Sequence, residues 1–360
     1  MPRFEQNILG LIPKEDWLSI PFVVNRPDSP IDQLFGDVKT ANLVAYWESI
    51  AAEYQVPLMA QFHGFDTESQ KTFRVPVDTH NIEKGLIKVK IDMSERIRAL
   101  LRAGVQNDDL YDYVINDGIR LAEQVITRTK VAKNELMASG QVTIKENNLD
   151  LTVDYGVPEA QKGLIFDFGA GAEKPIDEQL EDLVQGARNN GNIMNGFMTS
   201  RATLNKFRRN AILQKVINGA NMVGMQLSNA DLRAFLSEEY GLNNVIINDA
   251  TYGVPGGIVN GRPTVISKRY FPETGITFFA APNGGTKLGD GLWGDPPETD
   301  SGVERNNDVS GSSESPYVYL TQWAEHDPAV LWTKASTLFM PVLYKPDSLY
   351  IGTATETPAA

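Results

Sequence analysis

The longest amphipathic pattern in the chain predicts a single helix between about residues 107 and 139. With successive residues about 100° apart, its apolar side chains fall within an arc of roughly 160°: Val114, Ile115, Ile119, Leu121, Ala122, Val125, Ile126, Ala132, Leu136 and Met137. Charged residues fill the opposite arc, and only Lys133 falls on the apolar side. From residue 112 to residue 137 this helix spans roughly 39 Å. Asn107 or Asp108 can cap its start, and Gly140 can end it.

Gly118 stands in the interior of the predicted helix. Glycine costs a helix about 1 kcal/mol there relative to alanine. A glycine at this position indicates a bend or a close crossing with another element, which makes Gly118 a candidate hinge.

Residues 56–93, which precede the helix, have the character of β-strands. An aromatic run that includes Phe62, Phe65 and Phe73 leads into the polar stretch 78–81, and apolar and charged residues then alternate over 86–92. Alternation with a period of two predicts a strand with one covered and one wet face. Two such runs around a polar middle predict a long two-stranded ribbon. Because an isolated ribbon is only marginally stable, we expect it to lie on another surface.

The segments after the helix mix strands and helices. We expect hairpins that turn at Asn147-Asn148 and Asn260-Gly261 and strands at 164–168, 245–247 and 276–279. We expect helices from Pro175, from a cap at Thr199 or Ser200, and from a cap at Ser228. The order shows no regular strand–helix–strand rhythm, which predicts an α+β fold. Proline-broken residues up to about 35 predict an extended arm. Residues 295–316, rich in Asp, Glu, Gly and Ser, predict a long exposed loop, and strand-like segments return from 317 to 351.

Composition restricts the chemistry that the chain can perform. It has 360 residues, no cysteine and only three histidines, His63, His80 and His326, which lie far apart in sequence. Disulfides, thiolate metal sites and cysteine nucleophiles are therefore excluded. No apolar run of about 20 residues and no secretory signal occur, so we expect neither a membrane partner nor export. The formal net charge of −13 disfavours a protein whose main task is to grip nucleic acid.

Motifs for catalysis or cofactors are incomplete. Residues 169–174 (Gly-Ala-Gly-Ala-Glu-Lys) follow a predicted strand and precede a helix, as a phosphate-binding loop would. The third glycine is replaced by Lys174, however, and Glu173 would repel a phosphate. No other metal, nucleotide or hydrolase signature occurs, so we expect no catalytic residue, no cofactor and no metal. The basic cluster around Arg208 and Arg209 can be a solvated helix face, which we favour, or can touch nucleic acid or an acidic neighbour.

Four stretches together resemble the lambda-like major capsid protein E family of tailed phages. They are residues 85–91 (Gly-Leu-Ile-Lys-Val-Lys-Ile), 132–142 (Ala-Lys-Asn-Glu-Leu-Met-Ala-Ser-Gly-Gln-Val), 269–294 with Pro272, Leu288-Gly289 and Trp293-Gly294, and 338–348 (Leu-Phe-Met-Pro-Val-Leu-Tyr-Lys-Pro-Asp-Ser). Each stretch is common by itself, and their order and spacing carry the resemblance.

The resemblance implies the Hong Kong 97-like capsid fold, with an N-terminal arm, an extended β-hairpin loop, a long spine helix, and peripheral and axial domains. The implied divisions are an arm and lead-in at 1–50, the extended loop at 51–94, a peripheral domain with the spine helix at 95–164, an axial domain at 165–320 and returning peripheral strands at 321–360. The extended loop would contact a neighbouring subunit through Phe62, Phe65, Phe73, Arg74, Lys88 and Lys90.

The same resemblance implies a major capsid protein that assembles as pentamers and hexamers into an icosahedral shell around double-stranded DNA. Implied partners are other copies, a separate scaffolding protein, a portal protein, a decoration protein and, non-specifically, the packaged DNA. Assembly would occur in the host cytoplasm and the product would be the virion. Two alternatives stay open at this point: an encapsulin-like nanocompartment shell and a virion-associated hydrolase that uses acidic residues.

Overall fold

The computed structural model describes residues 29–49, 59, 74, 78–93, 95, 107–219, 224–259, 261–299, 317–326 and 329–358. Three of the expected contact residues, Phe62, Phe65 and Phe73, lie outside this part of the chain, as does most of the expected acidic loop.

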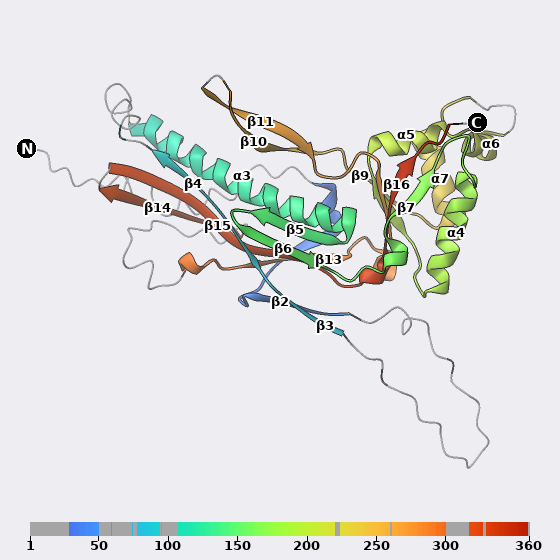
Figure 1. Cartoon of the computed structure of the whole chain (residues 1–360), viewed down its shortest axis with the longest axis horizontal. Helices are drawn as coiled ribbons and strands as arrows, with labels where there is room; N and C mark the ends of the chain where they lie inside the picture. Colours follow the sequence, from blue (N-terminus) through green and yellow to red (C-terminus); the bar gives the residue numbers. More distant parts are fainter. Residues whose placement is uncertain are drawn as a thin grey trace, which may run out of the picture.

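The described residues form helices and strands in mixed order (Figure 1). The α-helices are α3 (Asn107–Ser139), α4 (Ile176–Asn189), α5 (Arg201–Arg209), α6 (Ala211–Asn218) and α7 (Asn229–Tyr240). The strands are β1 (Phe35–Lys39), β2 (Val44–Ser49), β3 (Asp78–Glu83), β4 (Gly85–Met93), β5 (Gln141–Glu146), β6 (Leu149–Asp154), β7 (Leu164–Asp167), β8 (Gly196–Thr199), β9 (Asn244–Ile247), β10 (Thr251–Val259), β11 (Arg262–Arg269), β12 (Gly275–Phe279), β13 (Gly289–Gly294), β14 (Tyr319–His326), β15 (Ala329–Leu343) and β16 (Leu349–Thr355). A short 3-10 helix, η2 (Pro30–Gln33), precedes β1.

Two mixed sheets organise these strands. The first sheet has the order β1-β13-β15-β14, and β4 also pairs with the long strand β15. The second sheet has the order β7-β16-β12-β8-β9. Three further pairs, β2–β3, β5–β6 and β10–β11, form two-stranded ribbons. Parallel and antiparallel pairs occur together in both sheets, and helices are not interleaved regularly, so the α+β prediction is confirmed.

Helix α3 packs on the first sheet and forms the larger hydrophobic core with it (Figure 1). From Leu121 onward its apolar stripe is buried as predicted, with Leu121, Val125 and Leu136 among the least exposed residues. The helix ends at Gly140, whose φ of 71° lies in the left-handed region and whose N–H donates to Leu136 O at 2.8 Å. The helix is continuous through Gly118.

A second core lies between the second sheet and helices α4 to α7 (Figure 1). Aromatic rings make up much of it: the ring centroids of Phe197 lie 5.2 Å from Phe278 and 5.8 Å from Phe207. The expected helix after Ser200 is two helices, because Asn210 interrupts it and accepts hydrogen bonds from Ile212 N and Leu213 N as the cap of α6.

The expected middle of the ribbon is wrong, because it is a strand: β3, which begins at Asp78, pairs with β2. The second run forms β4 and pairs with β15 in the first sheet, whereas the first run lies almost wholly outside the described residues. The polar stretch 78–81, expected as the middle of the ribbon, is part of β3. Strand β3 is largely polar, with Ile82 packed against the core, so it carries no apolar strand pattern, whereas β4 alternates because its inner face packs against the core.

Two strands also pair outside the divisions expected from the sequence. Strand β13 was expected in the axial region 165–320, yet it pairs with β1 and β15 in the first sheet. Strand β16 was expected among the returning peripheral strands, yet it pairs with β7 and β12 in the second sheet. These pairings join segments far apart in sequence, which no local pattern reveals.

Candidate subunit-contact surfaces

The β2–β3 ribbon projects from the body of the molecule and leads to residues 50–77 (Figure 1). Its last pair, Ser49 with Asp78, marks where the ladder ends. On β2 and just before it, Leu43, Val44 and Tyr46 are exposed apolar side chains. Within the described residues, the ribbon therefore presents exposed apolar surface at Leu43 and Val44.

A buried lysine fixes the base of this ribbon. Lys84 stands between β3 and β4, and its ammonium donates to Thr40 O at 2.9 Å, Thr40 Oγ1 at 2.6 Å and Trp293 O at 3.0 Å. Its backbone N–H donates to Leu43 O. Burial lowers the pKa of Lys84, and the nearby charge of Asp295 partly opposes that change. Lys84 thus ties the ribbon to strand β13 of the first sheet.

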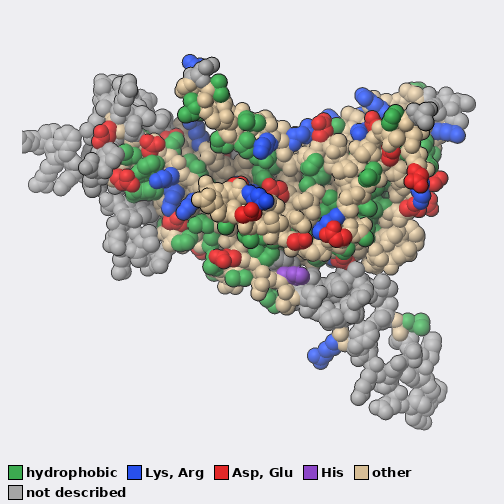
Figure 2. Space-filling view, viewed as in Figure 1, with side chains coloured by type: hydrophobic (Ala, Val, Ile, Leu, Met, Phe, Trp, Pro, Cys, Tyr) green, Lys and Arg blue, Asp and Glu red, His purple; other side chains and the backbone are tan. Residues whose placement is uncertain are grey.

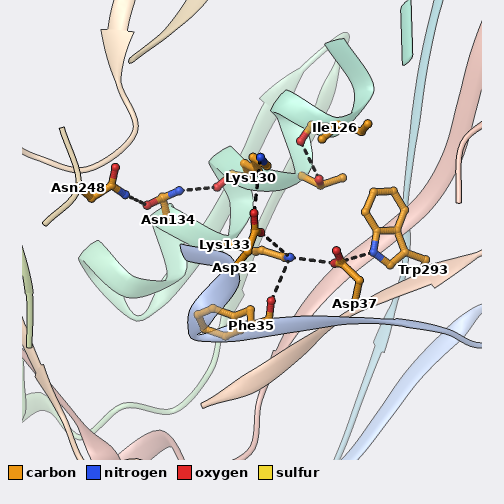
Figure 3. A network of polar contacts seen from close by, with 10 residues as sticks. Asp32, Phe35, Asp37, Ile126, Lys130, Lys133, Asn134, Asn248 and Trp293 are labelled. Atoms are coloured by element: carbon orange, nitrogen blue, oxygen red, sulfur yellow. Dashed lines mark hydrogen bonds and ion pairs between the residues drawn. The ribbon is translucent and has the colours of Figure 1, made fainter. Parts of the chain in front are cut away.

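A second buried lysine fixes the segment that follows the N-terminal arm (Figure 3). Lys133, only 1% exposed, donates from its ammonium to Asp37 Oδ1 at 2.8 Å, Asp32 Oδ1 at 3.3 Å and Phe35 O at 3.3 Å. Asp37 Oδ1 also accepts a hydrogen bond from Trp293 Nε1 at 2.8 Å. The side chain that interrupts the apolar stripe of α3 therefore attaches η2 and β1 to the helix.

Buried amide and hydroxyl groups connect α3 with the second half of the molecule (Figure 3). Asn248 Nδ2 donates to Asn134 Oδ1 at 2.7 Å, and Asn134 Nδ2 donates to Lys130 O at 2.8 Å. Thr277 Oγ1 of β12 donates to Met137 O at 2.8 Å. A shift of α3 would break these bonds, so the helix and the second sheet are positioned together.

All three expected contact residues in the described chain are exposed, and one of them, Lys90, also has a contact within the subunit. Arg74 and Lys88 are exposed. The ammonium of Lys90 lies 3.8 Å from the ring centroid of Trp332, on the face of the first sheet that also carries Trp323. This cation–π contact holds Lys90 on its own sheet.

The two arginines of the basic cluster on α5 differ in their contacts. Arg208 donates from Nε to Leu227 O at 2.7 Å and from Nη1 to Asn205 Oδ1 at 3.2 Å, so it joins α5 to the loop before α7. Arg209 is exposed. Figure 2 shows acidic and basic side chains interspersed over the visible face, without a large patch of one sign.

The glycine-rich stretch after β7 has a packing role. A Cβ at Gly169 would lie 2.0 Å from Thr357 O, and one at Gly171 would lie 2.2 Å from Pro358 O. The glycines therefore let the backbone of Thr357 and Pro358 pass close by. Within the described residues, no group of three His, Asp or Glu side chains can hold a metal ion, and no helix is long and apolar enough to cross a membrane.

Sequence reasoning missed the two lysine anchors. Lys133 was noticeable only as an exception in an apolar arc, and its partners Asp32 and Asp37 lie about 100 residues earlier. Lys84 gave no signal, because a lysine between two strands usually faces water.

Comparison with known proteins gives a consistent result. The sequence profile of the family described as phage major capsid protein E matches residues 57–354. A solved structure described as a capsid protein of a prophage from Escherichia coli CFT073 has a TM-score of 0.56 at 10% identity, covering 96% of this chain and 99% of that chain. A phage-related protein from Bordetella bronchiseptica RB50 has a TM-score of 0.52 at 11% identity, covering 94% and 95%. At such identities the likeness concerns the fold alone. No curated protein matches the sequence.

Proposed function

The chain belongs to the phage major capsid protein E family, and we propose that its copies assemble as pentamers and hexamers into the icosahedral shell that encloses the phage double-stranded DNA. It is a capsid shell protein of the virion with the Hong Kong 97-like fold. The family match over residues 57–354 carries this conclusion. Neither a nanocompartment nor a hydrolase is favoured by that match.

We propose that the β2–β3 ribbon and residues 50–77 reach a neighbouring subunit, with Phe62, Phe65, Phe73, Arg74, Lys88 and Lys90 in the contact. The exposed apolar residues at the ribbon's base and the Lys84 anchor support this proposal. A ribbon that must bind a neighbour needs a fixed direction, and three hydrogen bonds from one buried ammonium provide it.

The division into domains follows from the two cores. We propose a peripheral domain built from α3 and the first sheet, and an axial domain built from the second sheet and α4 to α7. The same proposal includes assembly in the host cytoplasm and the absence of catalysis. It also includes a separate scaffolding protein, a portal protein and a decoration protein as partners, and a non-specific contact of Arg209 with DNA or an acidic neighbour.

Removal of residues 50–77 tests the ribbon's part in assembly. Since Ser49 and Asp78 are directly opposed, an Asn-Gly turn can join them without distorting the ladder. The shortened subunit should unfold at the same temperature as the full chain when unassembled, yet should form no shells by negative-stain microscopy. Shells of normal size and yield from the shortened chain would contradict the proposed contact.

A further inference from the structure

A groove of about 1060 Å³ runs between helix α3 and the β10–β11 hairpin. Gln124 and Thr127 of α3 line one wall, Pro255 and Val265 of the hairpin line the other, and Tyr270 lies between them. The Tyr270 side chain lies near Thr127 of α3, and its ring centroid lies 4.9 Å from that of Tyr252. These contacts hold the base of the hairpin beside the helix, while the rest of the hairpin projects along it (Figure 1).

Apolar side chains of the hairpin are strongly exposed. Val265 is 74% exposed and Ile258 is 77% exposed, and Figure 2 shows apolar side chains gathered on the projecting hairpin. An isolated two-stranded ribbon is marginally stable, and exposed apolar clusters of this kind mark binding surfaces. On the helix side, Val131 lines the groove and is buried without being part of either core.

The chain itself enters the described structure beside this groove. Asp32 Oδ2 lies 3.5 Å from Lys130 Nζ, and Lys130 lines the groove. Ser29, the first residue of the described segment, is buried, and within the described residues its Oγ has no hydrogen-bond partner. The described chain therefore begins three residues before a side chain that contacts the groove lining.

Length and chemistry agree with an extended segment of this chain as the occupant. From Arg120 to Glu135, both in the lining, α3 rises roughly 22 Å, which about seven extended residues cover. Residues 20–28 read Ile-Pro-Phe-Val-Val-Asn-Arg-Pro-Asp, and their two prolines disfavour a helix. The charged side chains of the groove lining are of mixed sign, which suits a polypeptide more than a polyanion. The basic ones are Arg120, Arg128, Lys130 and Lys268, and the acidic ones are Glu123, Glu135 and Glu146.

We propose that the groove between α3 and the β10–β11 hairpin is the seat of this chain's own residues 20–28. The arm would cover Val265 and the apolar floor, and it would hold the hairpin against the helix. The proposal goes beyond shell formation and holds for a single subunit. Its test is accordingly independent of assembly.

Because the chain contains no cysteine, engineered cysteine pairs report the seat directly. Gln124→Cys, an exposed groove position, is combined in turn with Phe22→Cys, Val23→Cys or Val24→Cys in the full chain. Mild oxidation should give a disulfide within one chain, seen as a shifted monomer band on a non-reducing gel and as a cross-linked peptide by mass spectrometry. Since successive residues of an extended segment face opposite sides, Val23→Cys should differ several-fold in yield from its two neighbours.

The matched control moves the partner cysteine to Glu181 of α4, an exposed residue beside the other core, and should give no disulfide. A disulfide-linked dimer with Gln124→Cys would show that a second copy supplies the arm and would overturn the proposal. Equal or absent cross-linking at both partners would also overturn it. Particle formation by the same variants under reducing conditions reports separately on the shell function, so the two conclusions can fail independently.

Discussion

Lys133→Met removes the ammonium that attaches η2 and β1 to helix α3 while keeping a side chain of similar length. The variant loses the three contacts to Asp32, Phe35 O and Asp37. Removing one partner of a fully buried pair costs about 3–5 kcal/mol. The two carboxylates are 37% and 30% exposed as side chains, and each keeps another partner, Lys130 or Trp293. We therefore expect a loss of about 2 kcal/mol.

Urea unfolding of the unassembled subunit, followed by tryptophan fluorescence and circular dichroism, measures this loss. The matched control is Lys145→Met, because Lys145 pairs with Asp150 at 3.8 Å with both side chains more than 60% exposed. That change should cost no more than about 0.5 kcal/mol. The double variant Lys133→Met with Asp37→Asn should cost less than the sum of the single changes by about 1 kcal/mol. Equal stability of Lys133→Met and Lys145→Met would refute the anchor.

Three further changes test other parts of the structure. Gly140→Ala should destabilise the unassembled subunit by about 1–2 kcal/mol in thermal unfolding, because the φ of Gly140 is 71° and the added Cβ would lie 2.9 Å from Val157 Cγ2. The control is Gly156→Ala, because Gly156 also has a positive φ but its added Cβ would meet no atom within 4 Å. Burial raises the pKa of Glu135, with Arg128 opposing and Glu146 adding to the effect. Above the ordinary value of 4.5 the folded state therefore binds more protons than the unfolded state, and the protein loses stability as pH rises through the raised pKa. Glu135→Gln should be more stable than wild type at pH 7 and lose that advantage at pH 4, and an advantage independent of pH would contradict the assignment. Gly118→Ala should raise the stability of α3 by about 1 kcal/mol and, if Gly118 is a hinge, slow expansion of the precursor shell by time-resolved scattering; unchanged assembly and expansion would exclude the hinge.

Local signals carried the predictions that succeeded. The 3.6-residue period predicted α3, whose apolar residues are buried from Leu121 to Met137, and Gly140 ended the helix as expected. The Asn147-Asn148 turn has φ values of 50° and 65°, the left-handed geometry that asparagine tolerates. The caps Ser200 and Ser228 each accept a hydrogen bond from the third residue of the helix they precede.

Predictions failed where the structure depends on contacts between distant segments. The pairing of β13 with β1 joins residues about 250 apart, and no local period indicates such a partner. Among its described side chains, the β2–β3 ribbon packs Ala45 and Ile82 against the core, which is too few to impose an alternation from which its register could be read. Lys84 and Lys133 are buried only because carbonyls and carboxylates from other strands meet their ammonium groups.

The most direct test of a shell subunit is electron microscopy of the full chain purified after co-expression with the scaffolding gene of the same phage, combined with light scattering. The account predicts closed shells of uniform diameter in which pentamers and hexamers can be averaged. A monodisperse species with the mass of one subunit, with no shells at any concentration tested, would contradict it.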